Sequence, residues 1–486
     1  MADVDAARRA LEEVLGPTEV LSDPLALAVY ARDASMLEGE CALVAFPREV
    51  DHIVACVRVA AEHGLPIVPR GAGTGLAGGA TPVGDALVVV TTKMDRIVEV
   101  RPDDRLAWVE PGVVTLDLVT AVEPHHLTFA PDPSSRQSST IGGNVATNAG
   151  GPHCLASGTT ANHVLALDLV LPDGTVERLG SEGPSAPGYD LRAAVVGSEG
   201  TLGIVAAACV RLTPIPPAVR TMILDFTDIE DCAATVSGII ASGVVPAAIE
   251  LMDRPIVEAV ERFVHAGYPV DAAAVLIVEV DGTEAATRAQ AEAVERVARE
   301  HDVRTIRVAS DAEDRDRLWR GRRNALGAVG RIAPHYTLHD VVVPRTRLAE
   351  ALSAIAEIAR RHDLPVTCNA HAGDGNLHPH LHFDVRQAGA LERALAAGAE
   401  IVRLAVDLGG TISGEHGIGL EKRGALPLVW TDEDLAAQAC VRSAFDPDQH
   451  MNPHKVLPDG ARCGELPALG AVAATSAVSR PEDAWS

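Results

Sequence analysis

Short apolar runs separated by turn residues characterise the first half of the chain and predict small helices and strands in alternation. Residues 5–15 place Leu11, Val14 and Leu15 on one side of a helix that ends at Gly16. Apolar runs of about four to eight residues bounded by Gly or Pro are typical of buried strands. We therefore predict further helices at 47–64 and 114–121, and strands at 65–68, 86–91, 106–110, 164–171, 175–179 and 204–212.

The elements become longer after Pro214, Pro216 and Pro217, which mark the predicted domain boundary. The pattern predicts an α+β cap, in which helices cover one side of an open antiparallel sheet. Residues 458–486 are rich in Ala, Ser and Pro without an apolar period, so we predict a disordered tail. The expected strands lie near 221–226, 247–251, 274–280, 304–309 and 365–370, and the expected helices near 229–241, 284–300, 346–362 and 388–407.

The densest glycine segment, residues 69–79, follows the predicted strand 65–68 and contains five glycines in nine residues. Glycine lets a backbone adopt positive φ angles and approach a ligand closely. Successive N–H groups in such a loop form a concave site for a phosphate or pyrophosphate. A flexible surface loop is the alternative, but a strand on each side favours the anion site.

Residues 73–78 also match the dinucleotide-binding pattern G-x-G-x-x-G. That pattern requires a helix directly after the glycines, with its N-terminus facing the pyrophosphate. Only residues 80–85 precede the next predicted strand, and they include Pro82 and Gly84. Because six such residues are too few for a crossover helix, we reject the Rossmann interpretation.

Small residues dominate two further segments, 131–158 and 197–203. The first has an almost uninterrupted run of small side chains at 140–151, which is typical of backbone that packs against something flat, and we expect a cofactor there. For Gly142 and Gly143 alone, close packing at a helix crossing remains an alternative.

Histidines and acids concentrate in residues 371–382 and 413–419. His371 and His378 with Glu415 from the later segment form a candidate 2-His-1-carboxylate metal set with open positions. A hydrogen-bonded polar core or a solvated strand face is the alternative, since His378, His380 and His382 alternate along a strand. The flanking glycines favour close approach of a ligand.

Two more side chains are candidates for catalysis. His416 could act as a general base because imidazole titrates near neutral pH, although a packed histidine is an open alternative. Arg322 could bind a carboxylate through two N–H groups, although a solvated helix face is the more ordinary environment of an arginine.

Composition excludes several classes of protein. The 486 residues carry a formal net charge of −26, which argues against binding nucleic acid through a broad basic surface. The N-terminus lacks the apolar core of a signal peptide, and no apolar run is long enough to span a bilayer. None of the eight cysteines forms a C-x-x-C pair, so an iron–sulfur cluster within this chain is unsupported.

Taken together, the motifs resemble the FAD-linked oxidases of the vanillyl-alcohol-oxidase fold. The chain is most similar to the glycolate oxidase flavin subunit and to the D-lactate and D-2-hydroxyglutarate dehydrogenases. The resemblance covers about residues 20–457, and residues 451–456 resemble the family's closing motif. It rests on five blocks in the family's order: 69–79, 131–158, 197–203, 371–378 and 413–419.

The resemblance implies four parts: an FAD-binding domain at 1–217, a cap at 218–412, a segment at 413–457 that returns to the FAD domain, and the tail. It implies a divalent metal, with zinc expected, on His371, His378 and Glu415, and it makes His416 the base and Arg322 the substrate-carboxylate arginine. FAD would bind non-covalently at Pro69, Arg70, Gly71, Ala72, Gly73, Thr74, Gly75, Gly79, Pro133, Ser134, Ser139, Gly142, Gly143, Asn148, Gly150, Gly158, Glu199, Gly203, Ile204 and Asn452.

The implied activity is oxidation of a small 2-hydroxy acid, glycolate or D-lactate, with hydride transfer to flavin N5. A flavin electron-transfer subunit and a metal-free flavin alcohol oxidase are the alternatives. An iron–sulfur subunit or a quinone would accept the electrons, and a homodimer is compatible with the resemblance. We expect a cytoplasmic protein that reaches the inner face of the membrane only through such a partner.

Two departures from the family pattern stand out. Relatives that oxidise dicarboxylates carry a lysine just before the segment matching Asp340, where this chain has Thr337, Leu338 and His339. That difference favours short monocarboxylates. His454 occupies a position where the family usually has glycine.

Overall fold

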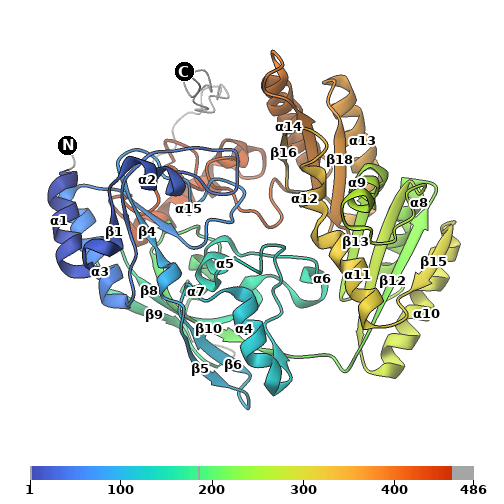
Figure 1. Cartoon of the computed structure of the whole chain (residues 1–486), viewed down its shortest axis with the longest axis horizontal. Helices are drawn as coiled ribbons and strands as arrows, with labels where there is room; N and C mark the ends of the chain where they lie inside the picture. Colours follow the sequence, from blue (N-terminus) through green and yellow to red (C-terminus); the bar gives the residue numbers. More distant parts are fainter. Residues whose placement is uncertain (1–2, 184–186, 462–486) are drawn as a thin grey trace. The chain divides into compact units, whose positions relative to one another are not determined.

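The computed structural model describes residues 3–183 and 187–461, and these form two compact units (Figure 1). Among the described residues, the first unit comprises 3–149, 159–183, 187–214 and 415–461, and the second comprises Gly150–Gly158 and Ile215–Gly414. The mixed α+β class predicted from the sequence is confirmed. The predicted disordered tail, 458–486, lies mostly outside the described residues.

One sheet of the first unit has the strand order β1-β2-β4-β3. β4 pairs in parallel with both β2 and β3. Side chains alternate between two apolar layers, with Leu87 and Val89 facing α1 and α3 and Val88 and Val90 facing the other way. The elements are α1 (Val4–Leu15), β1 (Val20–Leu21), α2 (Pro24–Tyr30), β2 (Cys41–Ala45), α3 (Val50–His63), β3 (Ile67–Arg70) and β4 (Ala86–Val90).

No helix connects the parallel strands β3 and β4, since residues 71–85 form a loop among the described residues. This finding confirms the rejection of the Rossmann interpretation. The predicted helix after Pro47 is also present, but it begins at Val50.

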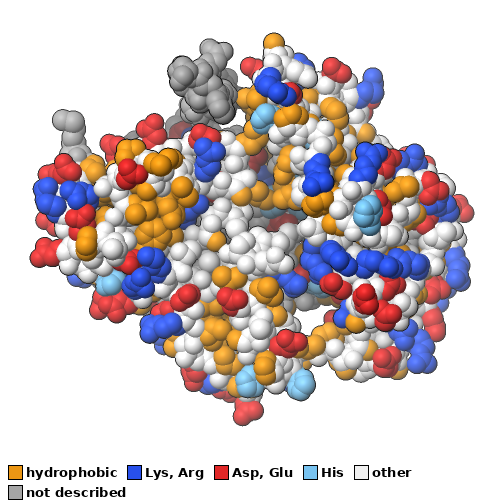
Figure 2. Space-filling model, in the orientation of Figure 1, with side chains coloured by type: hydrophobic (Ala, Val, Ile, Leu, Met, Phe, Trp, Pro, Cys, Tyr) orange, Lys and Arg blue, Asp and Glu red, His pale blue; other side chains and the backbone are white. Residues whose placement is uncertain are grey.

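Helix α2 is apolar around much of its circumference. Leu27 and Tyr30 pack against the sheet, whereas Leu25 and Val29 are 82% and 65% exposed. Figure 2 shows hydrophobic side chains gathered over this helix.

The second sheet of the first unit is antiparallel, with the order β5-β6-β10-β8-β9. Helices α4 and α5 share an apolar core with it, which includes Leu118, Ile141 and Val145. The elements are β5 (Ile97–Arg101), β6 (Leu106–Val109), α4 (Thr115–Val122), α5 (Ile141–Thr147), β8 (Val164–Val170), β9 (Val176–Gly180), α7 (Leu191–Val195) and β10 (Ile204–Arg211), with β7 (Leu127–Thr128) and β11 (Thr213–Pro214) paired beside them.

The C-terminal segment packs into the first unit after α15 (Asp432–Phe445). The N–H of Ile67 donates to the carbonyl of His450 at 2.9 Å, and the N–H of Asn452 donates to the carbonyl of Ile67 at 2.7 Å. These bonds place the chain after α15 alongside β3, the strand that leads into the glycine loop.

The second unit is built on one antiparallel sheet of order β15-β12-β14-β13-β18-β19-β16, with β17 paired to β19. The strands are β12 (Ala218–Phe226), β13 (Ala248–Asp253), β14 (Ala274–Gly282), β15 (Thr305–Val308), β16 (His335–Leu338), β17 (Val341–Val342), β18 (Val366–His371) and β19 (Asn376–Phe383).

The prediction that helices cover only one side of this sheet is wrong. Helices α8, α10, α13 and α14 pack on one face, and α9, α11 and α12 pack on part of the other. The second group escaped prediction because α11 is highly charged and α9 begins directly after a strand. The helices are α8 (Ile229–Ala241), α9 (Arg254–Val264), α10 (Glu284–Glu300), α11 (Ala312–Arg323), α12 (Ala325–Val329), α13 (Leu348–Arg361) and α14 (Ala390–Asp407), and the short α6 (Cys154–Ser157) belongs to this unit.

Among the helices of the described residues, none combines the length and the apolar character needed to cross a membrane.

Candidate functional site

The glycine loop after β3 presents unpaired backbone donors. Within the described part of the chain, the N–H groups of residues 72–75 donate no hydrogen bond. Beneath them, the buried Arg70 guanidinium donates to the carbonyl of Arg32 at 2.7 Å, and a side chain at Gly73 would collide with it. A loop of free N–H groups above a buried cation suits a phosphate-containing group.

The start of the small-residue run 140–151 lies beside this loop. A Cβ at Gly71 would lie 2.5 Å from Oγ1 of Thr140, the N-cap residue of α5. A Cβ at Gly142 would lie 2.6 Å from the Cβ of Pro111, so the absence of a side chain at Gly142 allows close packing against Pro111. Gly143 would meet only Thr140, at 3.2 Å, which leaves its surroundings more open.

Other predicted cofactor residues bind the protein's own backbone. Asn452 is fully buried, and its Nδ2 donates to the carbonyl of Gly79 at 2.9 Å and to that of Glu199 at 2.6 Å. The carboxylate of Glu199 accepts from the N–H groups of Ile418 and Gly419. Burial raises the pKa of Glu199, and these two amides oppose the rise. The contacts hold the glycine loop, the 197–203 loop and the C-terminal segment together.

The remaining predicted cofactor residues are divided between the units. In the first, the Asn148 side chain accepts from Ala161 N–H at 2.9 Å, and Ser139 is hydrogen-bonded to Thr115. Pro133 is buried and Ser134 is exposed; Gly203 packs on β8 and Ile204 begins β10. Gly150 and Gly158 belong to the second unit.

One face of the second unit's sheet carries the predicted histidines. Along β18 and β19, Cys368, Ala370, Leu377 and Leu381 face the apolar core with α13 and α14. The alternate positions therefore face the opposite side. They carry Thr367, Asn369, His371, His378, His380 and His382, all buried, which excludes the solvated strand face considered for the histidines.

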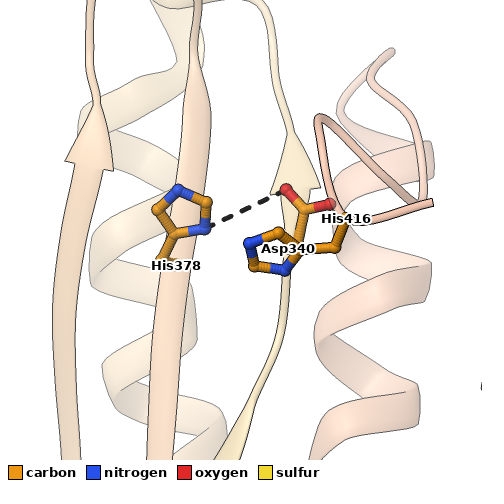
Figure 3. Close-up of side chains that lie close together, drawn as sticks. All are labelled: Asp340, His378 and His416. Carbon is orange, nitrogen blue, oxygen red and sulfur yellow. Dashed lines mark ion pairs between the residues drawn. The ribbon is translucent and has the colours of Figure 1, made fainter. Parts of the chain in front are cut away.

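His371 and His378 lie together on this face. Their ring centroids are 5.0 Å apart, and the ring planes are nearly perpendicular. His371 Nδ1 lies 2.7 Å from Oε1 of Glu250, and His378 Nδ1 lies 3.9 Å from Oδ1 of Asp340. Figure 3 shows the His378–Asp340 ion pair, drawn with His416.

Asp340 also binds the segment that directly precedes Glu415 and His416. Its Oδ2 accepts from the hydroxyl of Ser413 at 2.8 Å and from the N–H of Gly414 at 2.9 Å. Glu415 and His416 are the next two residues, so covalent continuity keeps them near the cluster. His416 Nε2 lies 3.7 Å from Oε1 of Glu415.

Two overlapping sets of side chains could hold a metal ion. The ligand atoms of His371, His378 and Glu415 lie within 4.8 Å of one another, and so do those of Asp340, His378 and His416. The first set is the one predicted from the sequence. Two imidazoles and one carboxylate are a common protein ligand set for divalent transition metals, and they leave positions open for substrate.

Arg322 is buried at the end of α11 rather than solvated on the helix surface. Its Nε lies 2.6 Å from Oε2 of Glu250, which is 0% exposed. Burial acts to raise the pKa of Glu250, but the positive charge of Arg322 and the contact with His371 hold it below its usual value. The guanidinium is thus fixed next to the predicted metal ligands.

Sequence reasoning did not assign a role to Glu250 or Asp340. Glu250 interrupts the apolar run of β13, and Asp340 precedes the apolar run 341–343. A charged residue inside a buried strand is a signal that could have been used.

Comparisons with known proteins show which families this chain is similar to. A family model described as FAD binding domain matches residues 41–180, and one described as FAD linked oxidases, C-terminal domain, matches residues 215–456. Glycolate oxidase subunit GlcD of Escherichia coli is 40% identical over 96% of this chain and 95% of its own length. D-lactate dehydrogenase of Anaerostipes hadrus is 32% identical over 84% of this chain and 87% of its own length.

Solved structures share the fold at low sequence identity. A structure of p-cresol methylhydroxylase with substrate bound aligns with a TM-score of 0.79 at 15% identity, covering 93% of this chain and 96% of that one. For 4-ethylphenol oxidase from Gulosibacter chungangensis the TM-score is 0.77 at 17% identity, covering 94% and 98% of the two chains.

Proposed function

Because the chain belongs to the FAD-linked oxidase family, we propose that it oxidises a short 2-hydroxy acid, glycolate or D-lactate, to the corresponding 2-oxo acid. Support comes from relatives named as glycolate oxidase subunits, at 40% and 39% identity, and from a relative named as D-lactate dehydrogenase, at 32% identity. The observation that carries the proposal is the pair of buried histidines that meet a carboxylate in one ligand set.

The first unit would hold the cofactor. The free N–H groups of residues 72–75 and the buried charge of Arg70 suit its pyrophosphate, with the N-terminal end of α5 beside them. Bound FAD supplies the two-electron acceptor for the oxidation. The backbone amides orient it, and Asn452 keeps the surrounding loops in register.

The second unit and the two residues after it would handle the substrate. His371, His378 and Glu415 would hold a divalent metal, with zinc the expected ion, which acts as a Lewis acid toward the hydroxy acid. Arg322 would bind the substrate carboxylate through the N–H groups that Glu250 does not engage. His416 would take the hydroxyl proton at an imidazole nitrogen.

The apolar side chain of Leu338, next to the histidines, favours a substrate with one carboxylate. β16 pairs with β19 so that Leu338 lies opposite His380 and Thr337 lies opposite Leu381. Directly opposed residues share a face, so Leu338 lies on the histidine face and Thr337 lies on the apolar side. An apolar side chain there offers no partner to a second carboxylate.

Anaerobic reduction of the bound flavin tests the proposal. We expect glycolate or one enantiomer of lactate to bleach the visible flavin bands of the purified, metal-replete protein. Failure of glycolate, D-lactate and L-lactate alike would contradict the substrate assignment, whereas failure to take up FAD would contradict the assignment of the first unit.

We also propose that the electrons leave through a separate iron–sulfur subunit or a quinone. The relatives with 40% and 39% identity are named as glycolate oxidase subunits, and no C-x-x-C pair occurs in this sequence. Copurification with an iron–sulfur protein would support the subunit, and full turnover of the single chain with a quinone analogue would favour the quinone.

A further inference from the structure

We propose that Glu250 is a positioning residue that fixes a metal ligand and the substrate arginine with one carboxylate. The inference rests on the proposed function, because it assumes that His371 binds the metal and that Arg322 binds the substrate. It assigns a role to a residue that neither provides a metal ligand nor contacts substrate.

The two oxygens of Glu250 are used separately. Oε1 lies 2.7 Å from His371 Nδ1, and Oε2 lies 2.6 Å from Arg322 Nε. Glu250 on β13 is the direct cross-strand partner of His371 on β18, so the two side chains leave the sheet on the same face. Arg322 reaches the same carboxylate from α11, which packs on that face.

The contact with His371 determines which ring nitrogen is available. A carboxylate accepts hydrogen bonds, so the proton of neutral His371 lies on Nδ1 and the lone pair lies on Nε2. A histidine ligand is commonly oriented through its second nitrogen in this way, and the partner also raises its basicity. Glu250 therefore prepares Nε2 for the metal.

The burial of Glu250 argues against a purely structural role, because a buried carboxylate carries a desolvation penalty. Glu250 is 0% exposed, and its neighbours on the same face of β13, Ala248 and Met252, belong to an apolar core. An apolar residue there would avoid the desolvation of a carboxylate. The charge is retained where it meets both a histidine and an arginine, and those two are the candidates for metal and substrate binding.

The same face offers a matched control. Glu279 on β14 is also buried, and it accepts from Trp319 Nε1 at 2.7 Å and contacts His153 at 3.4 Å. None of its partners belongs to the candidate metal set. Glu279→Gln therefore makes the same chemical change on the same sheet without touching His371.

The test measures zinc affinity of the purified full chain by competition with a chelator. Glu250→Gln should weaken zinc binding by about 10- to 100-fold, the range found for partners of metal-bound histidines, and Glu279→Gln should leave it unchanged. The double variant Glu250→Leu/Arg322→Met removes both charges of the buried pair, so it avoids an isolated charge if the first variant folds poorly. It should show the same loss of zinc affinity.

The outcomes separate the inference from the proposed function. If the native protein and the Glu250 variants bind zinc with equal affinity, the role of Glu250 is overturned and the proposed oxidation is unaffected. Native protein that binds no zinc would overturn both. A lower melting temperature of the Glu250 variants with native zinc affinity would identify a structural residue and contradict the inference.

Discussion

Replacement of Asn452 by alanine tests how the first unit holds its glycine loop. Asn452 adopts a φ of +40° and is fully buried, with its amide on the carbonyls of Gly79 and Glu199. Loss of each hydrogen bond costs about 1 kcal/mol, and more where the carbonyl remains unsatisfied. The left-handed backbone adds about 1 kcal/mol for alanine.

The sum is a destabilisation of about 3 kcal/mol, which lowers the melting temperature of a domain of 150–250 residues by about 6–12 °C. The measurement is thermal unfolding of flavin-free and flavin-loaded protein. Asn452→Gly serves as the matched control, because glycine tolerates the positive φ but lacks the amide. It should recover only the part of the loss that backbone strain causes.

The alternative role of Asn452 is direct contact with FAD, as the family resemblance implies. In that case Asn452→Ala would release FAD while the flavin-free protein melted at the native temperature. That result would refute the reasoning that Asn452 acts by joining the loops. A drop in both forms would support it.

Three further predictions concern other residues. His416→Ala should bind FAD normally but reduce it about 10²- to 10⁴-fold more slowly in anaerobic stopped-flow mixing, since a general base contributes about that much; native rates would contradict its role. Burial raises the pKa of Asp253 to about 7, so its contribution to stability should fall as pH rises from 4 to 7; in denaturant unfolding, the free energy of unfolding of native protein minus that of Asp253→Asn should decrease over this range, and a constant difference would contradict the assignment. His454 has a φ of +63° and is exposed, so His454→Gly should raise the free energy of unfolding by about 0.5 kcal/mol in the same assay, and a decrease would refute the strain argument.

Local pattern was sufficient for several elements of the fold. The predicted helices 229–241 and 284–300 coincide with α8 and α10, because each has a regular apolar face and a side-chain N-cap. Strands with a continuous apolar run, such as β12 and β14, were located to within a few residues. Periodicity succeeds where one apolar face meets one core.

The elements that carry the site were harder to predict. β19 was not predicted because histidine is polar and does not mark a buried strand, whereas His378, His380 and His382 are all buried here. α11 was not predicted because its apolar residues are few among charged ones, although Leu318 and Trp319 are buried. In both cases tertiary contacts supply what the local pattern lacks.

Contacts between distant segments were beyond the reach of pattern alone. Asn452 bonds to residues 373 and 253 positions earlier in the chain, and Glu250 bonds to a histidine 121 positions later. The unusual His454 does have a local explanation: its φ of +63° is a conformation that glycine adopts without strain. The departure from the family's glycine therefore carries a backbone cost.

The most direct test of the proposed chemistry is anaerobic addition of D-lactate or glycolate to FAD-loaded protein from which metal has been removed by chelation. We predict that the flavin bands persist until zinc is restored and then bleach. A parallel sample of the His371→Ala variant should remain oxidised at the same zinc concentration. Full bleaching of the metal-free native protein would contradict the proposal that His371, His378 and Glu415 bind a catalytic metal.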